Sequence, residues 1–140
     1  MKLKHIKAYM QTAEAFAACS TAVRAKVGAI LVKDERIISI GYNGTPIGAD
    51  NNCEDLQADG SLKTKQEVLH AETNCLAKVA RSSESSEGAT MFITLSPCFE
   101  CSKLIYQSGV RKVYFGAQYR NTDGIDFLRQ YGVEVEQCDV

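Results

Sequence analysis

The order of the apolar segments along the chain is the feature that most limits its fold. Two strand-like runs, 27–32 and 37–42, are separated only by the polar tetrapeptide 33–36, which is typical of a hairpin. Further along, helix-like and strand-like segments alternate to the end of the chain. A hairpin followed by this alternation predicts an α/β fold, because each later helix serves as a crossover between parallel strands.

Apolar periodicity also predicts where the helices begin and end. A first amphipathic helix is expected over 3–18, and Gly109 and Gly132 are expected to end the last two helices. The alternating part predicts helix 68–81, strand 89–95, helix 98–107, strand 112–117, helix 124–131 and strand 133–137. The predicted architecture is a three-layer α-β-α sandwich around a five-stranded mixed sheet, with strands three to five parallel.

Residues 43–66 interrupt this pattern. They are rich in Gly, Asn and Asp, contain Pro46 and show little apolar periodicity, so we expect a long loop, which in compact domains is often functional. The chain has 140 residues, 45% of them hydrophobic, which is enough to bury one core. Residues 1–140 are therefore expected to form a single domain.

Charge and hydropathy exclude several classes of function. The 16 Lys and Arg nearly balance the 17 Asp and Glu, whereas a protein that grips nucleic-acid backbones usually has a basic excess. No apolar run of about 18 residues is present, so no membrane span is expected. The N-terminus loosely imitates a signal peptide, but Gln11 and Glu14 interrupt its apolar region. We predict a cytoplasmic protein that binds neither long nucleic acid nor membrane.

Two short segments carry the residues suited to chemistry. His70 at one predicted helix start, with Cys98 and Cys101 at another, would supply three ligands for Zn²⁺. Helix N-termini favour the thiolate form of such cysteines. Three protein ligands leave a fourth coordination position open, which is typical of catalytic rather than structural zinc. Glu72, two residues beyond His70, is the candidate proton carrier.

Other interpretations of these cysteines stay open. Six cysteines in a chain with its own core indicate reduced thiols or metal ligands rather than a disulfide framework. Cys98 and Cys101 could instead form a thioredoxin-like redox couple, since such couples also begin helices. A structural zinc site would need a fourth ligand, for which the candidates are Cys19, Cys53, Cys75 and His5. Cys75 is expected to pack in the core.

Three segments together carry a family resemblance. They are GYNGTP at 41–46, HAETN at 70–74 and TLSPCFEC at 94–101, and the last two contain the H-x-E and P-C-x-x-C patterns of zinc-dependent nucleobase deaminases. From about residue 24 to 135 the sequence resembles the deoxycytidylate (dCMP) deaminases, the phage-encoded ones in particular. The resemblance implies the cytidine deaminase-like fold and hydrolysis of a cyclic amidine C–N bond, which converts dCMP to dUMP and ammonia for thymidylate supply.

The resemblance also implies regulation and assembly. It implies a homohexamer that dCTP activates and dTTP inhibits. For a phage-encoded member, it implies a location in the cytoplasm of the host. The effector site would include backbone amides around Gly44 and Mg²⁺ on the triphosphate. The effector-binding residues expected from the resemblance are Tyr42, Asn43, Gly44 and Thr45.

Substrate contacts are expected near the zinc site. Arg24, Lys26 and Arg120 lie near predicted strand ends, where arginine in particular suits a 5′-phosphate. For Lys26 and Arg120 a solvated surface charge is an equal alternative. The resemblance implies a ribose contact by Asn43 and a role for Tyr119. The expected substrate-binding set is Asn43, Ala71, Ser96, Pro97, Tyr119, Arg24, Lys26 and Arg120.

These residues predict a zinc-assisted hydrolysis. Zinc would lower the pKa of a bound water, and Glu72 would carry its proton to N3 and then to the departing amine as C4 of cytosine is attacked. Free cytidine deaminases, tRNA adenosine deaminases and polynucleotide cytidine editors share this chemistry, so the motif alone does not name the substrate. A non-catalytic nucleotide-binding module is the alternative from another class, and the complete motif argues against it.

Overall fold

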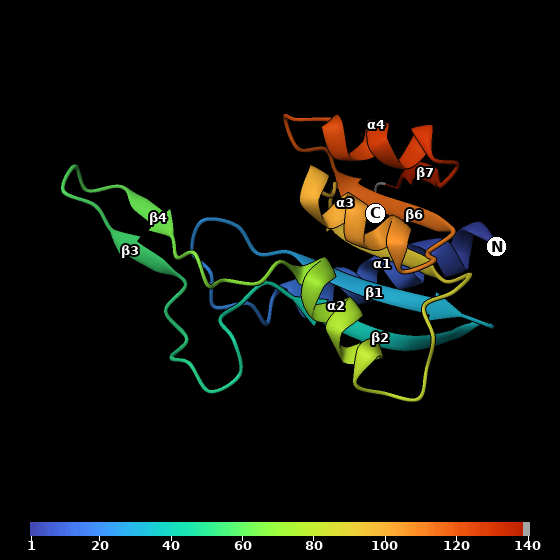
Figure 1. Ribbon diagram of the computed structural model, residues 1–140, viewed down its shortest axis with the longest axis horizontal. Coiled ribbons are helices and arrows are strands. Elements are labelled where there is room, and N and C mark those ends of the chain that lie inside the picture. The colour runs from blue at the N-terminus through green and yellow to red at the C-terminus, as the bar shows by residue number, and fades with distance from the viewer. Residues whose placement is uncertain (139–140) are drawn as a thin grey trace.

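The computed structural model describes residues 1–138, so the last two residues of the predicted domain, 139–140, lie outside the described residues. A five-stranded sheet with the order β2-β1-β5-β6-β7 lies between helices (Figure 1). Its strands are β1 (Gly28–Lys33), β2 (Arg36–Tyr42), β5 (Thr90–Leu95), β6 (Lys112–Ala117) and β7 (Glu134–Gln137).

The strand directions confirm the predicted mixed sheet. β1 pairs antiparallel with both β2 and β5, whereas β5, β6 and β7 run parallel. The helices α3 (Phe99–Gln107) and α4 (Asp123–Gln130) connect the parallel strands, as expected for crossovers. The carboxyl ends of β5 and β6 therefore meet at one edge of the sheet, which is where ligands bind in open α/β sheets.

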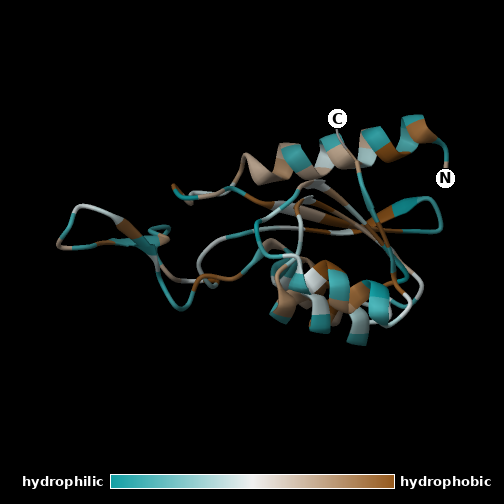
Figure 2. Cartoon of the chain, turned by 90° about the horizontal axis from the view of Figure 1, so that it is seen from above, coloured by the Kyte–Doolittle hydropathy of each residue, from teal (hydrophilic) through white to brown (hydrophobic). Residues whose placement is uncertain are grey.

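Helices cover both faces of the sheet. Seen from above, α1 (Leu3–Ala17) lies along one face, and α2 (Ala71–Ala80), α3 and α4 lie on the other (Figure 2). The central strands carry apolar side chains on both faces because each face is covered. Ile30, Phe92 and Tyr114 pack towards α1 in one cluster. Leu31, Met91, Val113 and their neighbours form the second, larger cluster towards the other helices.

The close packing of α2 on the sheet depends on Gly41 in β2. A Cβ atom at this position would lie 2.5 Å from both the Ala71 carbonyl oxygen and the Cys75 amide nitrogen. The absent side chain lets the first turn of α2 approach the strand directly. Ser39 lies two residues before Gly41 in β2, and its hydroxyl donates a hydrogen bond to the Cys75 carbonyl oxygen at 2.7 Å. These contacts fix the position of the first turn of α2, which contains Glu72.

Several predicted boundaries need correction. The helix predicted over 68–81 begins only at Ala71, because Leu69 pairs with Gly44 in an isolated antiparallel bridge and His70 has an extended backbone. The tetrapeptide expected to form the hairpin turn is reduced to Asp34 and Glu35, whose positive φ angles of 51° and 60° fit a two-residue turn that matches the strand twist. The other predicted helices and strands agree with the structure to within one residue at each end.

The expected loop over 43–66 is partly wrong, because it contains a second, two-stranded sheet. β3 (Glu54–Leu56) pairs antiparallel with β4 (Leu62–Thr64), and the resulting hairpin projects away from the three layers (Figure 1). A Gly60 residue with φ of 86° turns the chain between the two strands. Among the described residues, no helix is both long enough and apolar enough to cross a membrane.

Candidate metal and active site

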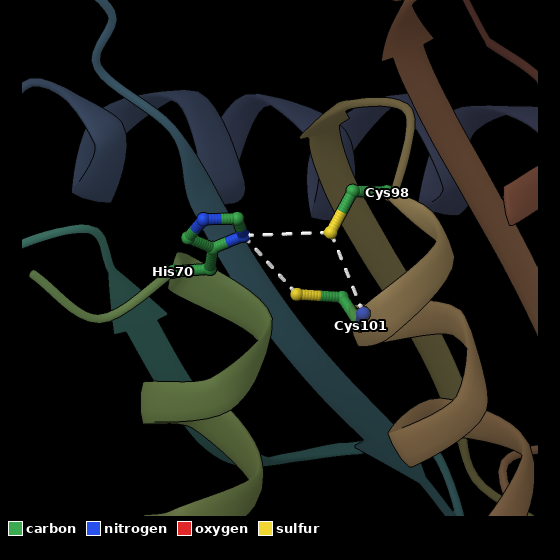
Figure 3. A group of neighbouring side chains, drawn as sticks. All are labelled: His70, Cys98 and Cys101. Carbon is green, nitrogen blue, oxygen red and sulfur yellow. Dashed lines mark hydrogen bonds between the residues drawn. The ribbon is translucent and has the colours of Figure 1, made fainter. Parts of the chain in front are cut away.

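Two helix N-termini meet at the centre of the site. His70 is the residue before α2 and Cys98 is the residue before α3, and both have extended backbones. Their side chains point towards each other, with Cys101 from the first turn of α3 below them (Figure 3). The Cys98 sulfur accepts a hydrogen bond from the Cys101 backbone N–H at 3.4 Å, so it also caps α3. Unpaired N–H groups at such termini favour negative charge on these sulfurs.

The three donor atoms have the spacing of ligands to one metal ion. His70 Nδ1 lies 3.2 Å from Cys101 Sγ and 3.7 Å from Cys98 Sγ, and all three atoms are within 4.8 Å of one another. Around a tetrahedral zinc ion, a ring nitrogen and a sulfur would be about 3.5 Å apart. The residues therefore fit Zn²⁺. Within residues 1–138 no fourth His, Cys, Asp or Glu joins this group, so a structural four-ligand site is not formed.

The electrostatics of the cluster favour a thiolate at Cys98. Hydrogen bonds from Cys101 and His70 to the Cys98 sulfur lower the pKa of Cys98 to about 4. The same pairing raises the pKa of the Cys101 thiol, and the hydrogen bond to Cys98 raises the pKa of His70. Thiolate sulfur beside imidazole is the donor combination that zinc prefers, because the ligands must give up protons to bind it.

Glu72 lies in the first turn of α2, next to this donor set. Only 3% of the residue is exposed, and it lines the same pocket as His70 and Cys98. Burial raises the pKa of Glu72 to about 7, since the charged carboxylate is poorly solvated there. A carboxyl group with a pKa near neutrality can both accept and donate a proton, as general acid–base catalysis requires.

A pocket of about 400 Å³ opens in front of the donor set. That volume lies within the range of small-molecule sites. The structure brings five of the predicted substrate residues into its wall: Arg24, Asn43, Ala71, Ser96 and Tyr119. It does not bring in the other three. Lys26 and Arg120 are exposed outside the pocket wall, and Pro97 is buried and does not line the pocket.

Two of these polar side chains shape the wall through hydrogen bonds to the backbone. Asn43 Oδ1 accepts from the Val27 N–H at 2.9 Å, while its Nδ2 donates to the Ala25 carbonyl at 2.8 Å. Ser96 Oγ accepts from the Tyr119 N–H at 2.7 Å, which holds the segment after β6 against the end of β5. Asn43 retains one amide hydrogen that can face a ligand.

The predicted effector residues have local structural contacts. The amide of Gly44 is predicted to hold a triphosphate. In the structure it donates to the Leu69 carbonyl at 3.1 Å, so it is not free to bind a phosphate. Thr45 donates from its hydroxyl to the Asp50 carbonyl at 2.6 Å. The Lys78 ammonium lies 6.0 Å from the centre of the Tyr42 ring. The backbone pairing of Gly44 is a feature that no local sequence pattern indicates.

Sequence reasoning missed one group of pocket residues, all from the region between β2 and α2. They are Cys53, Glu54, Thr64 and Val68. Glu54 is the most informative, because a buried carboxylate is costly unless it is hydrogen-bonded. Only 6% of it is exposed. A single acidic residue in a polar loop gives no sequence signal of burial, so only the fold could reveal it.

A family comparison agrees with this geometry. The family model for the cytidine and deoxycytidylate deaminase zinc-binding region matches residues 3–117, which include every donor atom of the cluster. The chain belongs to the cytidine and deoxycytidylate deaminase family. As a member of this family it is a hydrolytic deaminase, and the family and the donor set agree on Zn²⁺ as its metal. This favours metal binding over a redox couple for Cys98 and Cys101.

Individual deaminases resemble the chain over most of its length. A dCMP deaminase of the cyanophage S-TIM5, solved with dCMP and dUMP, is 54% identical, with a TM-score of 0.92 over 99% of each chain. The deoxycytidylate deaminase of Enterobacteria phage T4 is 36% identical over 79% of this chain and 77% of its own. That of Mycobacterium phage D29 is 37% identical over 76% of this chain and 90% of its own. The first of these confirms the predicted fold.

Metal analysis would test the donor set directly. We expect the purified protein to contain about one zinc ion per chain, and a chelator to lower its melting temperature because metal binding stabilises the folded state. Replacing either sulfur ligand, as in Cys98→Ala or Cys101→Ala, should remove the metal. Cys19→Ala is the matched control, since this exposed thiol lies outside the cluster and its loss should leave zinc content and melting temperature unchanged. Full zinc retention in Cys98→Ala would contradict the assignment.

Proposed function

We propose that the protein hydrolyses dCMP to dUMP and ammonia in the cytoplasm. The observation that carries the proposal is the composition of one pocket, which has His70, Cys98 and Glu72 in the same wall as Arg24 and Tyr119. A donor set with an open coordination position suits hydrolysis, and a guanidinium suits a phosphate. The cyanophage deaminase, which was solved with dCMP and dUMP, supports this choice of substrate.

The proposed mechanism centres on Glu72. His70, Cys98 and Cys101 would hold Zn²⁺, which when bound supplies a water of lowered pKa. The carboxyl of Glu72 accepts a proton from the attacking water and donates it to N3 of cytosine as the C4–O bond forms. Glu72 then takes the remaining proton of that water, from the hydroxyl now on C4, and carries it to the amine at C4. The C4–N bond breaks, and ammonia and dUMP leave.

The outer wall of the pocket would orient the nucleotide. Arg24 is the proposed phosphate ligand, since its guanidinium can bind two phosphate oxygens at once. Tyr119 lines the pocket with 53% of its surface exposed, so its ring is available to a ligand. Asn43 is held by the backbone at Val27 and Ala25, which fixes its remaining amide hydrogen for a sugar oxygen. Lys26 and Arg120 are not part of this proposed binding wall.

Ammonia release from three substrates tests the proposal. We expect zinc-loaded protein to deaminate dCMP, and to deaminate deoxycytidine or a cytosine-containing oligonucleotide much more slowly, because only the mononucleotide offers a terminal phosphate to Arg24. The assay should be repeated with dCTP and with dTTP, where we expect activation and inhibition. Preferential turnover of deoxycytidine or the oligonucleotide would overturn the substrate, and no turnover of any of them would favour a nucleotide-binding module.

Glu72→Gln separates proton transfer from metal binding. The amide has the shape of the carboxyl but cannot carry a proton, so turnover of dCMP should fall by roughly 10²- to 10⁴-fold. Zinc content should not change, because Glu72 is not among the three donors. Glu134→Gln, whose side chain is 72% exposed on β7, is the matched control and should keep full activity. Wild-type turnover in Glu72→Gln would show that another group moves the proton.

Regulation and assembly form a second part of the proposal. We propose a homohexamer whose activity rises with dCTP and falls with dTTP, with Mg²⁺ on the effector phosphates, near Tyr42, Asn43 and Thr45. Since the Gly44 amide pairs with Leu69, phosphate contacts there would come from other groups of this segment.

Sedimentation velocity with and without each effector would test the assembly. We expect a species of about six chains. A monomer under all conditions would contradict the hexamer without affecting the deaminase assignment.

A further inference from the structure

The β3–β4 hairpin contacts the pocket through the first pair of residues at its base. Glu54 opens β3 and lies directly opposite Thr64, which closes β4. Both residues line the pocket, whereas the rest of the hairpin projects away from the body of the protein (Figure 1). Within the wall of this pocket, the hairpin therefore contributes one cross-strand pair.

This pair holds Arg24 at two places. Glu54 Oε2 accepts hydrogen bonds from the backbone N–H of Arg24 at 3.0 Å and of Val23 at 2.9 Å. Thr64 Oγ1 accepts a hydrogen bond from Arg24 Nη1 at 3.3 Å. One residue of the pair thus fixes the backbone of Arg24 and the other fixes its guanidinium. The segment after α1, which contains Arg24, is otherwise exposed over most of its residues.

The buried carboxylate of Glu54 needs an explanation that catalysis does not give. It lines the pocket, but the metal donor set does not include it and Glu72 already supplies the proton carrier. Burying a charge is costly, and two charge-assisted hydrogen bonds from the backbone offset that cost. The result of these bonds is a fixed position for residues 23–24.

Fixing Arg24 before the substrate arrives has a definite energetic effect. A free arginine side chain has several rotatable bonds, and ordering it during binding costs affinity. The guanidinium has five N–H donors, so the bond to Thr64 leaves others available to a phosphate. A pre-ordered guanidinium favours ligands that carry a phosphate and has no effect on ligands without one.

We propose that Glu54 and Thr64 are positioning residues that hold Arg24 at the pocket and thereby make the enzyme select a nucleoside monophosphate over the nucleoside. This inference rests on the proposed deamination of dCMP. Neither residue touches the reacting atoms, so both act through Arg24. The hairpin, which the sequence does not predict, is then the element that sets substrate class.

Steady-state kinetics of Thr64→Val on dCMP and deoxycytidine test the proposal. Valine has the shape of threonine without the hydroxyl, so we expect KM for dCMP to rise about three- to tenfold with kcat little changed. The kcat/KM for deoxycytidine should stay at the wild-type value. Thr64→Ser, which restores the hydroxyl, should restore KM for dCMP. Thr12→Val is the matched control, since the Thr12 hydroxyl bonds to the Ala8 carbonyl within its own helix.

A double-mutant cycle identifies the residue through which Thr64 acts. Arg24→Ala alone should raise KM for dCMP more than Thr64→Val does, and adding Thr64→Val to Arg24→Ala should cause no further rise. Glu54→Gln, which keeps an acceptor for the two N–H groups, should have a smaller effect on KM than Glu54→Ala. Because Glu54→Ala removes the acceptor of two backbone N–H groups and can unfold this segment, the Thr64 variants carry the test.

The outcomes separate this inference from the proposed function. Equal losses for dCMP and deoxycytidine in Thr64→Val, no loss for either, or additive effects with Arg24→Ala would overturn the positioning role. If the wild-type enzyme itself shows no preference for dCMP over deoxycytidine, the proposed function fails before any variant is compared.

Discussion

The structure depends on the meeting of two helix N-termini at the carboxyl edge of the parallel strands. His70 precedes α2 and Cys98 precedes α3, and both have extended backbones that turn their side chains inwards. The helix dipoles make this point favourable for thiolate, while the sheet face on which both helices pack keeps the ligands together. Moving either helix would separate the nitrogen donor from the sulfur donors. The tight contact of α2 on Gly41 of β2 is therefore a condition for metal binding as well as for packing.

Local patterns in the sequence were sufficient for the parts of the molecule that bury apolar surface. The runs that became β1, β5 and β6 are apolar on both faces, and Gly109 and Gly132 have the positive φ angles that end helices. The donor set was also predictable, because H-x-E and P-C-x-x-C place ligand types at fixed spacing near helix starts. In each case the residues that carry the signal are neighbours along the chain.

The parts that sequence reasoning missed depend on contacts between distant segments. β3 and β4 have three residues each, and most of them are exposed, so they lack both the length and the alternation that predict strands. The bond between Glu54 and Arg24 joins residues 30 positions apart. The pairing of Gly44 with Leu69, which delays the start of α2, is of the same kind. No local pattern records such contacts.

The metal centre and the segments held by distant contacts have different parts in substrate choice. The donor set and Glu72 come from the helix starts that predictable packing creates, and such a centre can serve many amidine substrates because it contacts only the reacting atoms. Selection between substrates must come from groups that contact other parts of the ligand. In this chain the group proposed for that role is Arg24, and the pair Glu54 and Thr64 would act through it; they come from the segment after α1 and from the projecting hairpin. Both segments lie outside the apolar core, so they can change without disturbing the metal centre. A net charge of −1 is compatible with an anionic substrate, because one ordered guanidinium in a pocket can bind a phosphate without a basic surface.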